Sequence, residues 1–389
     1  MDLAAAPDTF SVSASPGFAA WLAAQNASIA FATPPSKLFL VGIRPDGELG
    51  VFERTFDKTM GLAREGTDRI YMGLRHQVWR LENVLPPPDR LEQGFDRCFV
   101  PRQVHTIGDV NVHDVSVAPD GDVWFVNTRF GCLSRLSDEH TFDPAWSPPY
   151  LPGPANGDRC HLNGLAMGPQ GPLFASSVSE TDAIDSWRDH RSGGGVVTHI
   201  PSGEVVARGF SMPHSPRWYD DRLWITNSGT GDLCLVDPDP GTFEPVAFIP
   251  GFPRGLSFIN HYAVVGSSKP REGDLYSGLG LGERLADMGL EPQLGIFVVD
   301  LQTGGVVEWM VVDGPMRELF DVITLPGVRR AMAVGLVSDE IERTHWIDSS
   351  SMRRTDAGTW DHVGTGEAGD ATRAVAEVDA LGRDGGVSG

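Results

Sequence analysis

The chain has 389 residues, 41% of them hydrophobic and 21% charged, so it can bury a full core in one large β domain or two smaller ones. Lysine and arginine total 31 against 52 aspartates and glutamates, and the formal net charge is −21. Such a surface repels phosphate backbones and anionic lipid headgroups, so we expect neither nucleic-acid nor membrane partners. The 46 glycines and 29 prolines favour turn-rich β structure over a helical fold.

The N-terminal residues 1–8 lack the basic and apolar regions of a secretion signal. No apolar run approaches the roughly 18 residues that a membrane helix needs. The four cysteines lie far apart, without a C-x-x-C pair, and we expect buried free thiols. These features together predict a cytoplasmic protein.

A helix is expected near the N-terminus. Pro16 suits a first-turn position, and Phe18, Trp21, Leu22 and Ile29 then recur near helical spacing. Beyond this segment the pattern changes to short β-type runs separated by Asp-Gly, Pro-Gly and Gly-Asp turns. We therefore expect an N-terminal extension at 1–37 that carries the helix and packs outside the main domain.

Residues 38–347 contain a repeated unit that opens with one strand and continues through a turn into further strands. Residues 115–127 followed by 131–136 form its cleanest copy. Equivalent opening positions follow at intervals of 54, 49, 52, 39 and 67 residues: Met60, Asp114, Asn163, Ser215, Arg254 and Asp321. These intervals suit four-stranded blades with variable loops, so we predict an all-β, six-bladed β-propeller. Seven blades are the alternative, if the 67-residue interval hides another unit.

Segments outside the repeat are expected to close or cover the ring. Residues 38–42 and 50–52 are candidates to complete it against the last blade, which hides the sheet edges. The insertions at 181–195 and 269–292 are expected to cap one face. Residues 348–389 contain few large apolar side chains and are predicted to be a disordered tail.

Three copies of the repeat place a histidine just before the opening strand: His113, His161 and His214. Opening strands line the central channel of a propeller, so equivalent positions converge at one mouth. Three neutral imidazoles there would form an open metal site, with zinc expected first and iron or copper as alternatives. His161 lies one residue further from its strand than the other two, unless a β-bulge compensates.

Four other residues are candidates to assist chemistry at this mouth. Arg254 opens the fifth copy and could bind a carboxylate or stabilise an oxyanion. Arg217 and Tyr219 share one face of the strand after His214, because strand residues alternate. Asp321 opens the sixth copy and could act as a base or orient an imidazole.

The segments 112–117, 119–121 and 212–215 resemble the blade openings of NHL-type propellers, above all the peptidyl-hydroxyglycine amidating lyase. That resemblance implies a catalytic zinc held by three channel histidines. The segment 161–166 is similar to a strand of the SMP-30/gluconolactonase propellers, in which the asparagine ligates a metal. This second resemblance implies an alternative calcium set of Asp114, Asn163 and Asp321. The whole chain resembles a bacterial, conserved-hypothetical and uncharacterised propeller family.

These observations predict a metal-dependent lyase, hydrolase or isomerase that acts on a small metabolite at the central channel. The metal is zinc by expectation, with iron, copper or calcium as alternatives. Two other functions stay open: a non-catalytic propeller binding module, and a calcium-dependent lactonase or esterase. The oligomeric state is not indicated by the sequence.

Overall fold

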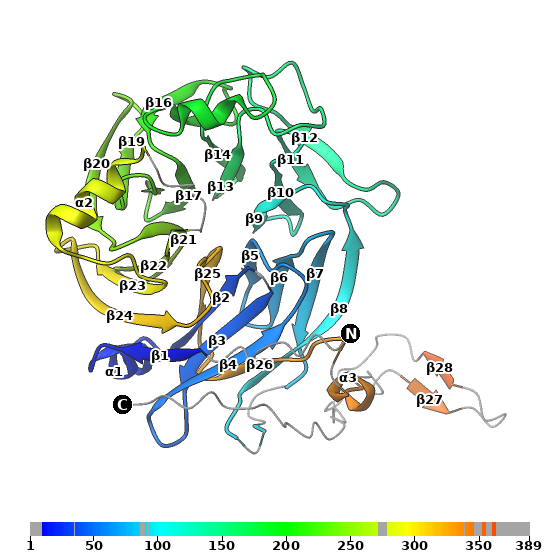
Figure 1. Cartoon of the computed structure of the whole chain (residues 1–389). Helices are drawn as coiled ribbons and strands as arrows, with labels where there is room; N and C mark the ends of the chain where they lie inside the picture. Colours follow the sequence, from blue (N-terminus) through cyan, green and yellow to red (C-terminus); the bar gives the residue numbers. More distant parts are fainter. Residues whose placement is uncertain are drawn as a thin grey trace, which may run out of the picture.

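The computed structural model describes residues 10–34, 36–85, 90–91, 93–270, 278–337, 339–345, 352–354 and 360–362. Within these residues, six antiparallel blades surround a central axis, as Figure 1 shows. The predicted six-bladed propeller is therefore confirmed. The interval from Arg254 to Asp321 holds the outer strands of the fifth copy and a helix rather than a seventh blade.

The first three blades contain most of the N-terminal half of the chain. Blade 1 consists of β25 (Asp321–Pro326), β2 (Ala27–Thr33), β3 (Lys37–Ile43) and β4 (Leu49–Thr55). Blade 2 consists of β5 (Leu62–Glu65), β6 (Arg69–Gly73), β7 (Gln77–Asn83) and β8 (Arg97–Thr106). Blade 3 consists of β9 (Val112–Val117), β10 (Val123–Asn127), β11 (Cys132–Arg135) and β12 (Asp143–Trp146).

The other three blades follow in chain order. Blade 4 consists of β13 (Leu162–Gly168), β14 (Gly171–Ser177), β15 (Gly195–His199) and β16 (Val205–Phe210). Blade 5 consists of β17 (Pro213–Tyr219), β18 (Arg222–Asn227), β19 (Asp232–Asp237) and β20 (Thr242–Phe248). Blade 6 consists of β21 (Phe252–Ile259), β22 (Tyr262–Ser268), β23 (Gly295–Asp300) and β24 (Gly305–Asp313), with β1 (Ser11–Ala14) paired outside β24.

Short elements lie between and after the blades. They are the 3-10 helix η1 (Ser186–His190), the helices α1 (Phe18–Ala24), α2 (Gly280–Met288) and α3 (Glu340–Arg343), and the strands β26 (Ala331–Ala333), β27 (Met352–Arg354) and β28 (Trp360–His362). Strand β26 runs parallel to β8 at the outer edge of blade 2. None of the helices described is long and apolar enough to cross a membrane.

The ring closes through blade 1, in which the late strand β25 pairs with the early strand β2. Strands β3 and β4 complete that sheet, as expected of residues 38–42 and 50–52. However, β1 and β2 precede the expected start of the propeller at residue 38 and also join its sheets. The helix ends at Ala24, and Ile29 lies in a strand whose residues are all buried. An apolar run covered on both faces satisfies a helical spacing by coincidence.

The helix itself lies outside the ring, as expected, and buries Phe18, Trp21 and Leu22 against blades 1 and 6. The four cysteines are free and buried, which confirms that expectation. Most of the expected disordered tail, residues 348–389, falls outside the described residues. Within it, β27 and β28 pair with each other.

Candidate metal centre

The inner strands of blades 3, 4 and 5 bring the three predicted histidines to one mouth of the ring. His113 and His214 are the second residues of β9 and β17, and His161 directly precedes β13. The potential ligand atoms of the three rings all lie within 4.8 Å of one another, and all three residues are buried. Zinc–nitrogen bonds of about 2.0–2.1 Å place the nitrogens of a tetrahedral site roughly 3.4 Å apart, so small side-chain rotations would close the set.

The His113 ring is fixed by hydrogen bonds at Nδ1. This atom lies 3.0 Å from the carbonyl oxygen of Asn111 and 2.7 Å from the hydroxyl of Thr128. Because the Thr128 hydroxyl donates to the carbonyl oxygen of Leu162 at 2.6 Å, it accepts from the imidazole. Nδ1 of His113 therefore carries the proton, and the lone pair of the neutral ring is on Nε2.

His214, two blades further around the ring, repeats this arrangement. Its Nδ1 lies 3.0 Å from both the carbonyl oxygen of Met212 and the hydroxyl of Ser228. The Ser228 hydroxyl donates to the carbonyl oxygen of Pro253 at 2.6 Å, so it too accepts from the imidazole. Met212 has a φ of 50°, a left-handed conformation that is unfavourable for a bulky side chain and that aims its carbonyl at the ring.

His161 reaches the same mouth by a different local route. Its backbone φ is 52°, and the pairing register of β13 shifts between Leu162 and Gly164, so a bulge is present where the sequence requires one. Its Nδ1 donates to the Asp158 carboxylate at 2.6 Å. Its ring stacks on Trp187 with centroids 4.1 Å apart. All three imidazoles thus have acceptors at Nδ1 and carry their lone pair on Nε2, which is the form that binds a metal.

Burial keeps at least one of these rings neutral. Desolvation holds the pKa of His113 well below its usual value, and the positive charge of Arg254 and the neighbouring His161 lower it further. A neutral imidazole is the ligand form, so protons do not compete with a metal for His113 near neutral pH.

The histidines line a cavity of about 550 Å³. Its apolar wall includes Trp187, Phe252 and Phe320, and Arg254 also lines it. The guanidinium carbon of Arg254 lies 3.4 Å from the centroid of the Phe320 ring. The arginine predicted to bind an anion is therefore in the same cavity as the histidines.

Both insertions cover this face of the ring, as expected. Trp187, from the 181–195 insertion, and Leu281 and Leu285, from α2 in the 269–292 insertion, belong to one buried cluster with Met212 and Phe252. Met212 and Phe252 also line the cavity, so the cap packs directly on the walls of the site.

Arg217 and Asp321 lie deeper in the channel, in an ion cluster with Asp114. Arg217 donates to both carboxylate oxygens of Asp114, at 2.6 and 3.1 Å, and lies 3.5 Å from Asp321. We call Arg217, Asp114 and Asp321 the axial ion cluster. Burial, and secondarily the charge of Asp114, raise the pKa of Asp321 to about 7, although Arg217 opposes that shift.

The axial ion cluster connects all six blades. Arg217 of blade 5 also donates to the carbonyl oxygen of Leu256 in blade 6. Asp114 of blade 3 accepts from the backbone N–H of Leu165 in blade 4, and Asp321 of blade 1 accepts from that of Leu62 in blade 2. These contacts indicate that Arg217 and Asp321 hold the ring together across its axis, whereas the sequence suggested roles in chemistry.

Tyr219 is not brought to the histidines. It ends β17, five residues from His214 and therefore about 17 Å away along an extended strand. Its ring stacks on Phe258 with centroids 4.4 Å apart, and its hydroxyl donates to the carbonyl oxygen of Asn260. The alternation of residues along a strand predicts which face of the strand a side chain occupies, but it does not indicate which end of the channel the side chain lies near.

The alternative calcium residues also have other partners. The side-chain amide of Asn163 accepts from Ser176 at 2.8 Å and donates to the carbonyl oxygen of Pro213 at 2.7 Å. Asp114 and Asp321 accept N–H bonds and share the Arg217 guanidinium. A calcium ion needs six to eight oxygen ligands, and here a cationic side chain lies beside the two carboxylates.

Sequence reasoning missed the residues that orient the imidazoles. Thr128 and Ser228 directly follow Asn127 and Asn227, the equivalent last residues of β10 and β18, so the repeat alignment contained that signal. Asp158 and Trp187 come from loops outside the repeat, where no periodic pattern marks them.

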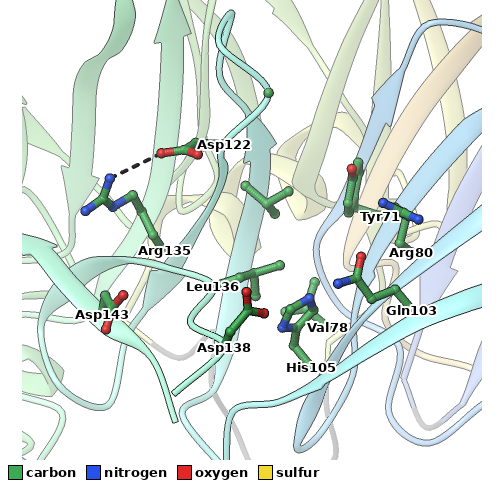
Figure 2. A pocket seen from close by; sticks show the side chains of 12 residues that line it. Tyr71, Val78, Arg80, Gln103, His105, Asp122, Arg135, Leu136, Asp138 and Asp143 are labelled. Atoms are coloured by element: carbon green, nitrogen blue, oxygen red, sulfur yellow. Dashed lines mark hydrogen bonds and ion pairs between the residues drawn. The ribbon is translucent and has the colours of Figure 1, made fainter. Parts of the chain in front are cut away.

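A second cavity, of about 410 Å³, lies between blades 2 and 3 (Figure 2). Tyr71, Arg80 and His105 line one side, and Asp122 and Arg135 pair at 3.2 Å on the other. The three site histidines do not line it, so it is separate from the metal centre.

Comparison with known proteins finds a matching family of unknown function. The family model described as "Domain of unknown function (DUF4915)" matches residues 16–334, which confirms the expected resemblance to an uncharacterised family. No curated protein matches the chain.

Solved structures with a similar arrangement include three bacterial proteins. One of unknown function from Bacteroides caccae is 11% identical with a TM-score of 0.45, covering 77% of this chain and 98% of that one. A gluconolactonase from Xanthomonas campestris is 12% identical with a TM-score of 0.46, covering 74% and 88%. A virginiamycin B lyase from Staphylococcus aureus is 11% identical with a TM-score of 0.35, covering 78% and 99%.

Proposed function

We propose that this chain, which belongs to the DUF4915 family, is a metal-dependent enzyme that acts on a small molecule in the histidine cavity. His113, His161 and His214 bind the metal through Nε2. The observation that carries the proposal is that each of the three converging rings has an acceptor at Nδ1. Structural histidines do not require this shared tautomer, whereas a three-nitrogen metal site does.

Zinc is the metal we propose, because neutral imidazoles suit it and three protein ligands leave a coordination position open. Iron and copper accept the same ligands and are the alternatives. A bound zinc ion supplies Lewis acidity, which lowers the pKa of water and polarises an oxygen of the substrate. This chemistry supports a lyase, hydrolase or isomerase.

The other residues of the cavity bind and orient the substrate. Trp187, Phe252 and Phe320 provide apolar walls that exclude water, which strengthens every electrostatic contact inside. Arg254 provides a fixed positive charge for an anionic group or for negative charge that develops during the reaction. Trp187 and Arg188, from the 181–195 insertion, contribute directly to the cavity lining.

Metal analysis tests the proposal. Purified protein, dialysed against zinc without chelator, should bind one equivalent, and the His113→Ala/His161→Ala/His214→Ala variant should bind none. The matched control replaces His76, His105 and His261, which lie outside the cavity lining, and should keep the wild-type zinc content. If the wild type takes up no zinc, iron or copper, or if the site variant keeps its metal, the propeller is a binding module instead.

A further inference from the structure

The histidine cavity has the opposite charge character to the protein as a whole. The chain has a net charge of −21. The cavity lining nevertheless contains more basic than acidic side chains: Lys58, Arg75, Arg188 and Arg254 against Asp158 and Glu318. A basic pocket in an acidic protein concentrates small anions and excludes polyanions, which the surrounding surface repels.

Two of the basic residues lie at the rim of the cavity. Arg75 and Arg188 are about half exposed, and they pair with Asp57 at 3.1 Å and with Asp185 at 3.0 Å, respectively. Exposed pairs of this kind contribute little to binding energy, so we assign Arg75 and Arg188 a steering role.

Arg254 is the buried basic residue of the cavity, with 8% of its surface exposed. Its guanidinium stacks on Phe320, and the Phe320 ring in turn contacts His113 with centroids 5.3 Å apart. Stacking on Phe320 fixes the plane of the guanidinium. A planar fork held in this way matches a carboxylate better than a single point charge does.

We propose that the cavity binds small carboxylates that carry a second oxygen next to the carboxylate, such as 2-hydroxy or 2-oxo acids. The carboxylate pairs with Arg254, and the second oxygen faces the Nε2 atoms of the three histidines, where the metal binds. This inference rests on the proposed metal centre. It adds the substrate class and assigns Arg254 the role of charge recognition.

The proposal is tested by comparing a charged and an uncharged ligand, each on proteins with and without the positive charge of Arg254. Cobalt-loaded protein is titrated with glycolate, with glycolamide and with inorganic phosphate, and binding is followed by the visible spectrum of the metal. Glycolamide keeps the 2-hydroxyl group and lacks the negative charge. We expect glycolate to bind about tenfold or more tightly than glycolamide in the wild type, because a charge-assisted pair forms.

The Arg254→Gln variant should lose that preference. Glycolate affinity should fall about tenfold or more, while glycolamide affinity and metal content stay unchanged. Arg254→Lys should fall between the two, because it keeps the charge and loses the fork. Arg135→Gln, an exposed arginine in blade 3 outside the cavity lining, is the matched control and should behave as wild type.

Three results would overturn the carboxylate assignment: equal affinity for glycolate and glycolamide, unchanged glycolate affinity in Arg254→Gln, or tighter binding of phosphate than of glycolate. Metal content is measured on the same samples. A chain that binds no metal refutes the proposed function, and the same ligands are then ranked on metal-free protein by thermal shift. Metal uptake with no preference for the carboxylate refutes this inference alone.

Discussion

Two hydroxyl groups orient two of the site imidazoles in the same way, although they belong to different blades. Thr128 accepts from His113 and donates to a strand carbonyl, and Ser228 does the same for His214. Such outer partners fix the tautomer of a ligand and increase its basicity. The hydroxyls should therefore influence metal affinity without touching the metal.

Thr128→Val removes the hydroxyl with little change in shape. We expect metal affinity to fall about 10–100-fold, measured by competition with a chromogenic chelator. Thr324→Val is the matched control, because Thr324 is also a buried threonine on an inner strand, and its hydroxyl donates to the carbonyl oxygen of Phe258. It should lose stability and keep metal affinity. Equal metal affinity in both variants would contradict the orienting role.

At the residue scale, repetition made the histidines predictable, because three copies of one unit carry them near the same position. The residues that contact His161 are not repeated from blade to blade. Asp158 precedes His161 by three residues in a loop, and Trp187 lies in an insertion, so only the folded chain brings them to the ring. The roles of Arg217 and Tyr219 depended on their depth in the channel, which strand alternation does not report.

At the scale of the strand, close packing around the axis requires glycine. A Cβ atom at Gly164 would lie 2.2 Å from Cδ of Pro216 on the neighbouring inner strand. We expect Gly164→Ala to lower the free energy of unfolding by about 1–3 kcal/mol, measured by urea denaturation. Gly282→Ala in α2, which meets nothing within 4 Å, should be neutral or stabilise the protein by up to about 1 kcal/mol. Similar effects of both substitutions would contradict close packing at the axis.

The axial ion cluster predicts a larger effect. Arg217→Met leaves Asp114 and Asp321 buried without their counter-charge, and such a loss costs about 3–5 kcal/mol. Adding Asp114→Asn to Arg217→Met removes one of the two carboxylate charges and should recover part of that stability. Chemical denaturation at pH 8 measures both. No recovery in the double variant would mean that Arg217 acts through packing rather than charge.

Asp321 should make the stability of the ring depend on pH. Burial raises its folded-state pKa to about 7, above the usual value of 3.8, so the native state binds a proton that the unfolded state has lost. The stabilisation that Asp321 gives the folded state by binding this proton is fully present below about pH 4 and is lost as the pH rises through about 7. Its environment includes Arg217 and Asp114. Between pH 5 and 8, wild-type stability should fall more steeply than that of Asp321→Asn, and equal slopes would contradict this assignment.

At the scale of the whole molecule, the repeat predicted the six blades because each blade begins with a strand that must reach the axis. All six opening positions lie at or within three residues of the start of an inner strand. The strand β2 was not predicted, because its apolar run continues the helical spacing of α1. The role of β2 depends on β25, nearly 300 residues later, and local sequence cannot reveal such a pairing.

The stability of the ring should be separable from metal binding at the three histidines. The blade cores consist of apolar clusters that do not include the histidines, so the metal-free ring should remain folded. Metal should then stabilise the wild type only by linkage, about 2.7 kcal/mol at a hundredfold excess over Kd. The variant that lacks His113, His161 and His214 should melt close to chelator-treated wild type and should not respond to zinc.

If the histidines were instead structural caps, each truncation would leave a buried polar partner unsatisfied at a cost of about 1–3 kcal/mol. The variant would then melt well below chelator-treated wild type, and thermal unfolding of both proteins with zinc and with chelator distinguishes the two cases.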